Sequence, residues 1–176
     1  MEDTSLAARA ADGDEAAFEL LVRRHTESVW RLARSILHDD FEAEEAVQDT
    51  FLKAHRALAS FRGEAAFRTW LLAICHRTCL DRLRVRRAAV VPLALVRDRR
   101  TAEEMPDIRL ALEQILNGLS EDERRAFVLV HVLAFSREEA ARICEVPAST
   151  MRSRVARARE RLAALIEAGD AAEEDA

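Results

Sequence analysis

The chain has 176 residues and a formal net charge of −5, a length that suits one or two small domains. Four glycines, three prolines and no tyrosine, with abundant alanine, leucine, arginine and glutamate, predict an all-α fold. The sequence shows no apolar run of membrane-spanning length and no signal peptide, so an integral membrane protein is excluded and a cytoplasmic location is expected.

Charge is distributed unevenly along the chain. Residues 77–100 carry eight arginines and two aspartates, hence +6, whereas the last ten residues carry five acids and no base. The acidic total therefore hides a strongly basic segment, which suits a protein that meets nucleic acid with only part of its surface.

Two long helices are predicted in the first third of the chain. Residues 14–37 place apolar side chains at helical spacing. This stripe consists of Phe18, Leu21, Val22, Val29, Trp30, Leu32, Ala33 and Ile36. Asp39 is the expected N-cap of a second helix that runs to about Ala59. Its buried stripe consists of Ala43, Val47, Phe51, Ala54 and Leu58.

The start of that second helix is strongly acidic, with six acids and no base between residues 39 and 49. Acids in a first turn interact favourably with the helix dipole, by about 0.3–1 kcal/mol each, so a structural origin is one interpretation. Glu42, Glu45 and Asp49 continue past the first turn on the predicted exposed side, which suits docking to a basic partner. Both interpretations stay open from the residues alone.

An aromatic and basic segment follows at residues 61–70, with the sequence FRGEAAFRTW. It predicts a loop at residues 61–64 and a helix from about Ala66 to Arg87, which carries Arg77, Arg82, Arg84, Arg86 and Arg87. Aromatic rings interleaved with arginines suit single-stranded DNA, because unstacked bases stack on the rings for about 1–3 kcal/mol each. The alternative is that Phe67 and Trp70 pack the domain interior.

The cysteines do not indicate a metal site. Cys75 and Cys79 are four residues apart with His76 beside them, but no fourth ligand is evident. We expect buried thiols that act as small apolar residues, and Cys144 to be a core residue of the same kind. No cofactor and no metal are expected.

The second half begins after a predicted linker, 88–106, which contains two prolines and no clear hydrophobic period. Helices are then predicted near 107–117, 120–133, 136–143 and 147–166. Ser120 and Glu123 have the spacing of a capping box. The tail after Glu167 is acidic and is expected to fray.

The last two predicted helices form a helix-turn-helix, whose second helix can enter the DNA major groove. One stripe of the second helix is apolar and must pack on Ala141 and Ile143. It consists of Met151, Val155, Ala158 and Leu162. The opposite face consists of Ser149, Ser153, Ala156, Arg157 and Glu160, flanked by Arg152 and Arg159 on one side and by Arg154 and Arg161 on the other. Small residues permit close approach to base edges, and arginines reach phosphates. A solvated amphipathic helix is the alternative.

Four segments in this order resemble the extracytoplasmic-function (ECF) sigma factors of bacterial RNA polymerase. They are FELLVRRH at 18–25, EAEEAVQDTFL at 42–52, the 61–71 run with LDRLR at 80–84, and the helix-turn-helix. The resemblance covers nearly the whole chain. It implies sigma region 2 at 1–87, a linker at 88–106, sigma region 4 at 107–167 and an acidic tail at 168–176.

The resemblance also implies a function: binding core RNA polymerase and directing promoter-specific initiation, with no catalysis by the chain itself. Docking on the coiled coil of the polymerase's largest subunit is implied for Glu45, Gln48 and Asp49. Capture of an extruded base at the −10 element, and of nearby phosphates, is implied for Phe61, Arg62, Glu64, Phe67, Arg68, Trp70, Arg77, Arg82, Arg84 and Arg86. Recognition of the −35 element is implied for Ser149, Arg152, Ser153, Ala156 and Arg157. Further implied partners are the polymerase flap and an anti-sigma factor.

Three positions depart from the family pattern. Arg77 stands where asparagine is common, and Glu145 and Ser149 stand where glycine is common. A left-handed backbone at Glu145 would cost about 1–2 kcal/mol, so a differently shaped turn is expected there.

The main alternative function is a stand-alone helix-turn-helix regulator of duplex DNA, which leaves the acidic helix and the 61–70 segment without a purpose. A metal-dependent nucleic-acid enzyme built on Glu44 and Asp49 is disfavoured, because residues five apart on a helix point apart.

Overall fold

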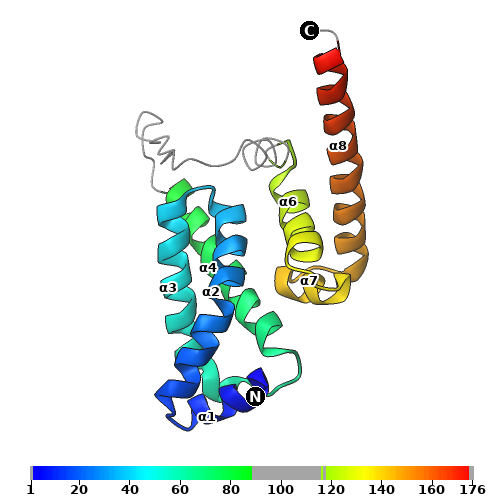
Figure 1. Ribbon diagram of the computed structural model, residues 1–176. Helices are drawn as coiled ribbons and strands as arrows, with labels where there is room; N and C mark the ends of the chain where they lie inside the picture. The colour runs from blue at the N-terminus through cyan, green and yellow to red at the C-terminus, as the bar shows by residue number, and fades with distance from the viewer. Residues whose placement is uncertain (1, 89–115, 117, 175–176) are drawn as a thin grey trace. The chain divides into compact units, whose positions relative to one another are not determined.

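The computed structural model describes residues 2–88, 116 and 118–174, without the side chains of Arg87 and of 166–174 (Figure 1). These residues form helices joined by turns, with no strand among them, so the predicted all-α fold is confirmed. The predicted linker at 88–106 and the helix predicted near 107–117 lie almost wholly outside the described residues.

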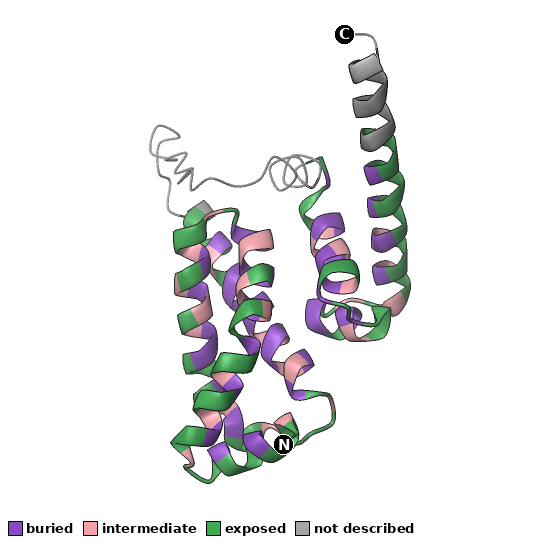
Figure 2. Cartoon of the chain, viewed as in Figure 1, coloured by how far each residue is buried: buried purple, intermediate pink, exposed green. Residues whose placement is uncertain are grey.

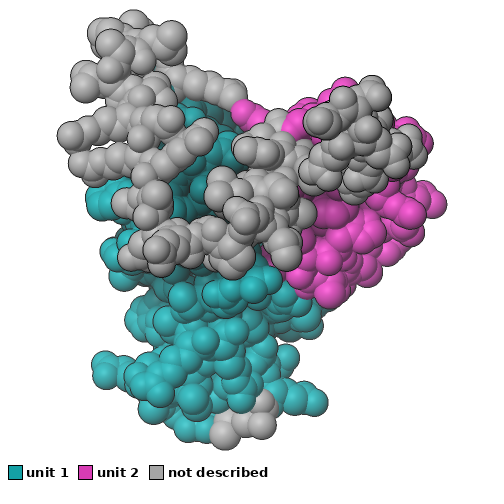
Figure 3. All heavy atoms as spheres, turned by 45° about the horizontal axis from the view of Figure 1, so that its top comes forward, with its two compact units in different colours: residues 1–93, 142–145 teal, residues 94–141, 146–176 magenta. Residues whose placement is uncertain are grey.

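The chain divides into two compact units (Figure 3). Residues 1–93 make up nearly all of the first, and the second is formed by 94–141 and 146–176. Residues 142–145 are coloured with the first unit in Figure 3, although they complete a helix of the second. Each unit has buried residues of its own (Figure 2).

The first unit is a helical bundle. Its elements are α1 (Asp3–Ala11), α2 (Glu15–Leu37), α3 (Asp40–Ala57), the short 3-10 helix η1 (Leu58–Ser60) and α4 (Phe67–Ala88). Helices α2, α3 and α4 pack against one another, and α1 packs on α2, η1 and α4. The sequence did not predict α1.

The predicted helix starts and apolar stripes of this unit are confirmed. Asp14 Oδ1 accepts a hydrogen bond from the Ala17 backbone N–H at 3.0 Å, and Asp39 Oδ1 accepts one from Glu42 at 2.8 Å. Side chains bind free N–H groups in this way at helix N-termini. Of the two predicted stripes, nine residues are buried and four, Phe18, Val22, Trp30 and Val47, are half-buried.

The cysteines behave as small core residues, as predicted. Cys75 and Cys79 are fully buried in α4, and Cys144 is buried at the end of the helix Arg137–Cys144. The pKa of the Cys75 thiol is raised by its hydrogen bond with Cys79 and by burial. It therefore stays protonated, which makes it a poor metal ligand or nucleophile.

The second unit contains the helix-turn-helix. Its described elements are α6 (Glu121–Phe127), a π-helical turn η3 (Val128–Val132), α7 (Arg137–Cys144) and α8 (Ala148–Glu174). The capping box of Ser120 and Glu123 is present at the start of α6. The apolar stripe of α8 is buried as predicted, and so are Ala141 and Ile143, but α8 packs mainly against α6 rather than against α7.

Two predictions for this unit were wrong. Glu145 has φ 55°, so the tight left-handed turn is kept without glycine. The Val146 N–H bonds the Ala141 carbonyl at 3.0 Å and the Glu145 N–H bonds that of Arg142 at 3.2 Å, which are the two bonds of a Schellman motif. In addition, α8 does not fray after residue 167 but continues to Glu174, because its alanines and glutamates favour helix and a single glycine is tolerated.

Candidate polymerase and nucleic-acid interfaces

An aromatic cluster forms where the loop after η1 meets α4. The rings of Phe61, Phe67 and Trp70 lie 5.2–5.5 Å apart between centroids, and the His25 ring of α2 lies 5.5 Å from that of Phe67. Phe61 and Trp70 are half-buried, so part of each ring faces solvent. Phe67 is only 2% exposed. The DNA contact predicted for Phe67 is therefore wrong, and its role is to support the other two rings.

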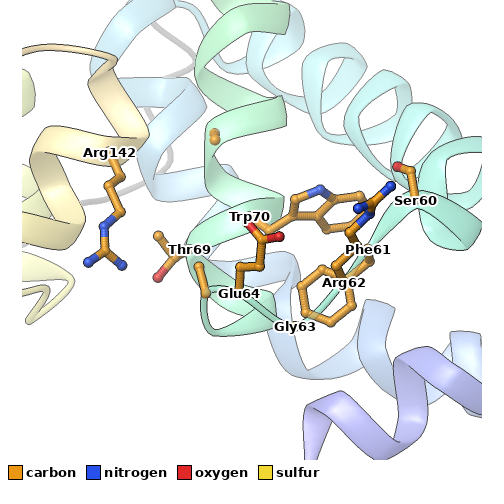
Figure 4. A pocket seen from close by; sticks show the side chains of 10 residues that line it. Ser60, Phe61, Arg62, Gly63, Glu64, Thr69, Trp70 and Arg142 are labelled. Atoms are coloured by element: carbon orange, nitrogen blue, oxygen red, sulfur yellow. The ribbon is translucent and has the colours of Figure 1, made fainter.

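Polar side chains surround the exposed part of this aromatic cluster (Figure 4). Arg62 and Glu64 are exposed and form no ion pair with any described residue. Between them, Gly63 has φ +70°, a conformation that favours glycine. Arg68 is half-buried and donates to Ser28 Oγ of α2 at 3.3 Å. Flat apolar surface beside the exposed side chains of Arg62 and Glu64 suits an unstacked base.

The arginines of α4 do not form a single group. Arg77 and Arg84 are exposed, and Arg84 pairs with Asp81 on the same helix at 3.2 Å. Arg82 and Arg86 turn instead toward α3. At 1.5 Å per residue they lie roughly 18 and 24 Å along the helix from Trp70.

Arg82 links α4 to the acidic side of α3. Its Nη1 donates to Glu45 Oε2 at 2.8 Å and its Nη2 to Asp49 Oδ2 at 2.6 Å, while Arg86 Nη1 lies 3.4 Å from Glu42 Oε2. Burial opposes the charge of Arg82, but the hydrogen bonds to Asp49 and Glu45 outweigh it and raise its pKa. Arg82 therefore has two carboxylate partners, whereas the side chain of Arg86 is still 53% exposed, and the phosphate contacts predicted for both stay predictions.

The acids of α3 divide into those of the first turn, which include Glu42 although it was predicted to lie past it, and those further along the helix. The first-turn acids are structural, because Asp39 caps the helix, Asp40 pairs with Arg34 and Glu42 pairs with Arg86. Glu45 and Asp49 keep 45% and 44% of their side chains exposed. Their hydrogen bonds to Arg82 fix the carboxylates without covering them.

Two large apolar residues complete the outward face of α3, and the sequence analysis missed both. Phe41 is 62% exposed and Leu52 is 56% exposed. At 100° per residue, they fall within about 60° of Glu45 and Gln48 around the helix. Large apolar side chains on the polar side of an amphipathic helix mark an interaction surface, and that was the available signal.

The predicted DNA-facing side of α8 is exposed at all five positions, Ser149, Arg152, Ser153, Ala156 and Arg157. The arginines on the two sides of this face differ in their ion pairs. Arg154 pairs with Asp122, while Glu123 lies 3.2 Å from Arg161 and 3.7 Å from Arg157. On the other flank, Arg152 and Arg159 form no ion pair with the described residues. Helix α6 thus neutralises one flank and leaves the other positive.

Metal binding and membrane spanning have no structural support within the described residues. These contain no cluster of three or more His, Cys, Asp or Glu side chains placed to hold a metal ion. None of their helices has the length and apolar character that crossing a bilayer requires.

Both units match known families. Residues 21–89 match the model of Sigma-70 region 2, and residues 109–162 match that of Sigma-70, region 4. This pair of matches defines a sigma factor, which is a transcription initiation factor. A stand-alone helix-turn-helix regulator would account only for the second match.

Similar proteins show to which group of sigma factors the chain belongs. The chain is 40% identical over 169 residues to the ECF RNA polymerase sigma factor SigM of Mycobacterium tuberculosis (strain ATCC 25618 / H37Rv), covering 93% of this chain and 84% of the relative. It is 33% identical to the RNA polymerase sigma-H factor of Pseudomonas aeruginosa, covering 90% and 91%. The chain therefore belongs to the ECF sigma factor family.

Two solved structures are similar to this chain over most of its length. CnrH, in complex with the cytosolic domain of CnrY, has a TM-score of 0.73 and 32% identity over 94% of this chain and 97% of that one. The sigma factor RpoE of Bartonella quintana, in complex with the anti-sigma factor NepR, has a TM-score of 0.70 and 28% identity over 85% and 96%.

Proposed function

We propose that this sigma factor docks on core RNA polymerase through α3, captures the melted −10 element with residues 61–70 and recognises the −35 element with α8. One observation carries the proposal: a single chain holds an aromatic site for unstacked bases in one unit and a helix-turn-helix face for duplex DNA in the other. The proposed division is region 2 at 1–87, a linker at 88–106, region 4 at 107–167 and a tail at 168–176. The matched ranges 21–89 and 109–162 support it.

Polymerase docking is assigned to Glu45, Gln48 and Asp49, with Phe41 and Leu52 beside them. Half-exposed carboxylates between two exposed apolar side chains suit a partner that is basic at its centre and apolar at its edges. The coiled coil of the polymerase's largest subunit is the proposed partner. Arg82 holds two of the carboxylates in place.

Strand capture at the −10 element is assigned to Phe61 and Trp70 as stacking surfaces and to Arg62 and Glu64 as polar contacts. Extruding a base costs a few kcal/mol, which stacking and hydrogen bonds must offset. Arg68 positions the start of α4 through Ser28. The proposed phosphate contacts are Arg77, Arg84 and Arg86, whose side chains are all more than half exposed.

Recognition of the −35 element is assigned to Ser149, Arg152, Ser153, Ala156 and Arg157 on the exposed side of α8. Serine and alanine allow the helix to approach base edges, and the arginines reach bases and phosphates. Contact between the second unit and the polymerase flap belongs to the same proposal.

The proposed function also includes an anti-sigma partner and a place of action. The similar proteins CnrH and RpoE were each solved with a protein partner, the second of which is an anti-sigma factor, so we propose an anti-sigma partner for this chain. We also propose that the polymerase supplies all the catalysis. The chain then works in the cytoplasm, where the polymerase acts.

A selection experiment tests the function. Core polymerase with the purified chain transcribes a library of random-sequence DNA, and the templates that yield run-off transcripts are sequenced. We expect two shared elements upstream of the start sites and no enrichment without the chain. Tight, specific duplex binding by the chain alone, with no affinity for core polymerase, would support the stand-alone regulator instead.

A further inference from the structure

We infer that helix α1 positions the aromatic cluster for strand capture, through Asp3 and His25. The inference rests on the proposed function of residues 61–70. It goes beyond that function because it gives a role to a helix outside both the predicted DNA contacts and the matched region 2.

Helix α1 is fixed to the bundle at both ends. At its start, Asp3 Oδ1 accepts from Arg24 Nη1 and Asp3 Oδ2 pairs with His25 Nε2, both at 2.8 Å. At its end, Arg9 Nε donates to Asp14 Oδ2, the N-cap of α2, at 2.9 Å. Between these points, Leu6, Ala7 and Ala10 are buried.

The ring of His25 connects this anchor to the aromatic cluster. Burial lowers the pKa of His25, although Asp3 favours the charged ring, and Arg68 and Arg24 add to the lowering. The ring is therefore neutral near pH 7, and it must carry its proton on Nε2 to donate to Asp3. This bond fixes the plane of a ring that packs at 5.5 Å on Phe67, which in turn contacts Phe61 and Trp70.

A second contact joins α1 directly to the loop. A Cβ placed on Gly63 would lie 3.8 Å from Thr4 Cγ2, so α1 lies against the turn that presents Arg62 and Glu64. Helix α1 also packs on η1 and α4, which flank the loop. Asp3 thus supports the aromatic cluster through His25, and Thr4 lies against its loop at Gly63. Asp3 and His25 are positioning residues, because neither needs to touch DNA.

The test measures promoter opening by the full chain with core polymerase. A promoter from the random library carries 2-aminopurine in its −10 element, whose fluorescence rises on unstacking. Asp3→Asn keeps the shape of the side chain and removes its charge. Asparagine has one acceptor oxygen where Asp3 has two, so it cannot accept from Arg24 and His25 together, and the charge of Asp3 is lost. We therefore expect opening to slow about fivefold with unchanged affinity for core polymerase. Asp12→Asn, the same change on an exposed residue at the end of α1, is the matched control and should open as the wild type does.

A double-mutant cycle separates positioning from general destabilisation. His25→Gln can still donate to Asp3 but has no ring to pack on Phe67. If both residues act through one contact, Asp3→Asn combined with His25→Gln opens no more slowly than His25→Gln alone. The rates are measured where circular dichroism shows every variant folded. Should Asp3→Asn not fold, Asp3→Glu takes its place in the cycle.

Two results would overturn the inference: opening by Asp3→Asn at the wild-type rate, or full multiplication of the two single effects. Failure of the wild-type chain to open any selected promoter with core polymerase would be a different result. It would overturn the proposed function, and the inference with it.

Discussion

Glu123 is a buried carboxylate that serves two helices. Its Oε2 accepts from the Ser120 backbone N–H at 3.1 Å, which closes the cap of α6, and the same oxygen lies 3.2 Å from Arg161 of α8. Burial raises its pKa, but the hydrogen bonds of Ser120 and the charges of Arg161 and Arg157 outweigh burial, so the pKa lies below its ordinary value. The ionised form is therefore the one that stabilises the second unit.

Glu123→Gln should weaken α6 by about 0.3–1 kcal/mol at pH 7, because glutamine can still bond Ser120 but lacks the charge that interacts with the helix dipole, Arg157 and Arg161. A carboxylate with a lowered pKa stabilises above its ordinary value, near 4.3, and this stabilisation is lost as the pH falls through the lower folded value. The variant and the wild type should therefore converge in acid. Hydrogen exchange in peptides that cover α6 measures the difference, since a chain of two units need not unfold in one step. Glu160→Gln, on the exposed side of α8, is the control. If hydrogen exchange of α6 differed between Glu123→Gln and the wild type by the same amount at every pH, the prediction would be contradicted.

Trp70→Ala tests the half-buried edge of the aromatic cluster. The variant should fold and bind core polymerase but open promoters roughly tenfold more slowly, because a stacked base contributes about 1–3 kcal/mol. Measurements are 2-aminopurine fluorescence for opening and circular dichroism for folding. Trp30→Ala, which removes an equally large half-buried ring outside the aromatic cluster, controls for lost packing. Opening at the wild-type rate, or loss of the fold, would show that Trp70 serves the core alone.

The sequence predicts helices well where a capping side chain fixes the residue at which the helix begins. Asp39 and Ser120 each accept the capping hydrogen bond expected of them. Helix α1 was missed because Leu6 is the only large apolar residue in its nine residues. So short a segment is marginal alone and depends on packing against α2, which no local pattern shows.

The candidate sites were predictable in composition but not in geometry. The 61–70 segment and the outer face of α8 were found from their residues, yet the sequence could not tell that Phe67 is buried while Trp70 is partly exposed. Nor could it tell that Arg82 pairs with Glu45 and Asp49, because those residues lie on different helices more than 30 positions apart. Interactions of that kind are set by tertiary packing.

Reversing two charges on α3 tests whether this helix binds core polymerase. Glu45→Lys with Asp49→Lys places two cations beside Arg82 and opposite a basic partner. We expect co-purification with core polymerase to be lost while the helical circular dichroism persists, since exposed ion pairs contribute only about 0–1 kcal/mol to stability. Glu19→Lys, at an exposed position of α2, should keep polymerase binding. Retained co-purification of the double variant would remove the docking role.

Charged residues are distributed over the whole molecule so that only parts of its surface attract DNA. A net charge of −5 opposes general attraction to DNA, while Arg152 and Arg159 of α8 and Arg62 of the loop before α4 form no ion pair with the residues that the structure describes. Phosphate contacts supply most non-specific affinity, so an acidic chain gains little from DNA alone. On the proposed function, promoter binding depends on both surfaces acting together on the polymerase.

This division of labour predicts a crossed response to template design. Arg157→Ala should weaken −35 recognition by about 1–3 kcal/mol, and a template with a scrambled −35 element should remove the difference from the wild type. A template already unpaired over the −10 element should leave that difference intact. The defect of Trp70→Ala should instead persist when the −35 element is scrambled and shrink when the −10 element is unpaired, because part of the cost of extruding a base has been removed. Run-off transcription of the three templates by both variants and the wild type gives the comparison. If premelting rescues both variants equally, the two surfaces do not have separate tasks.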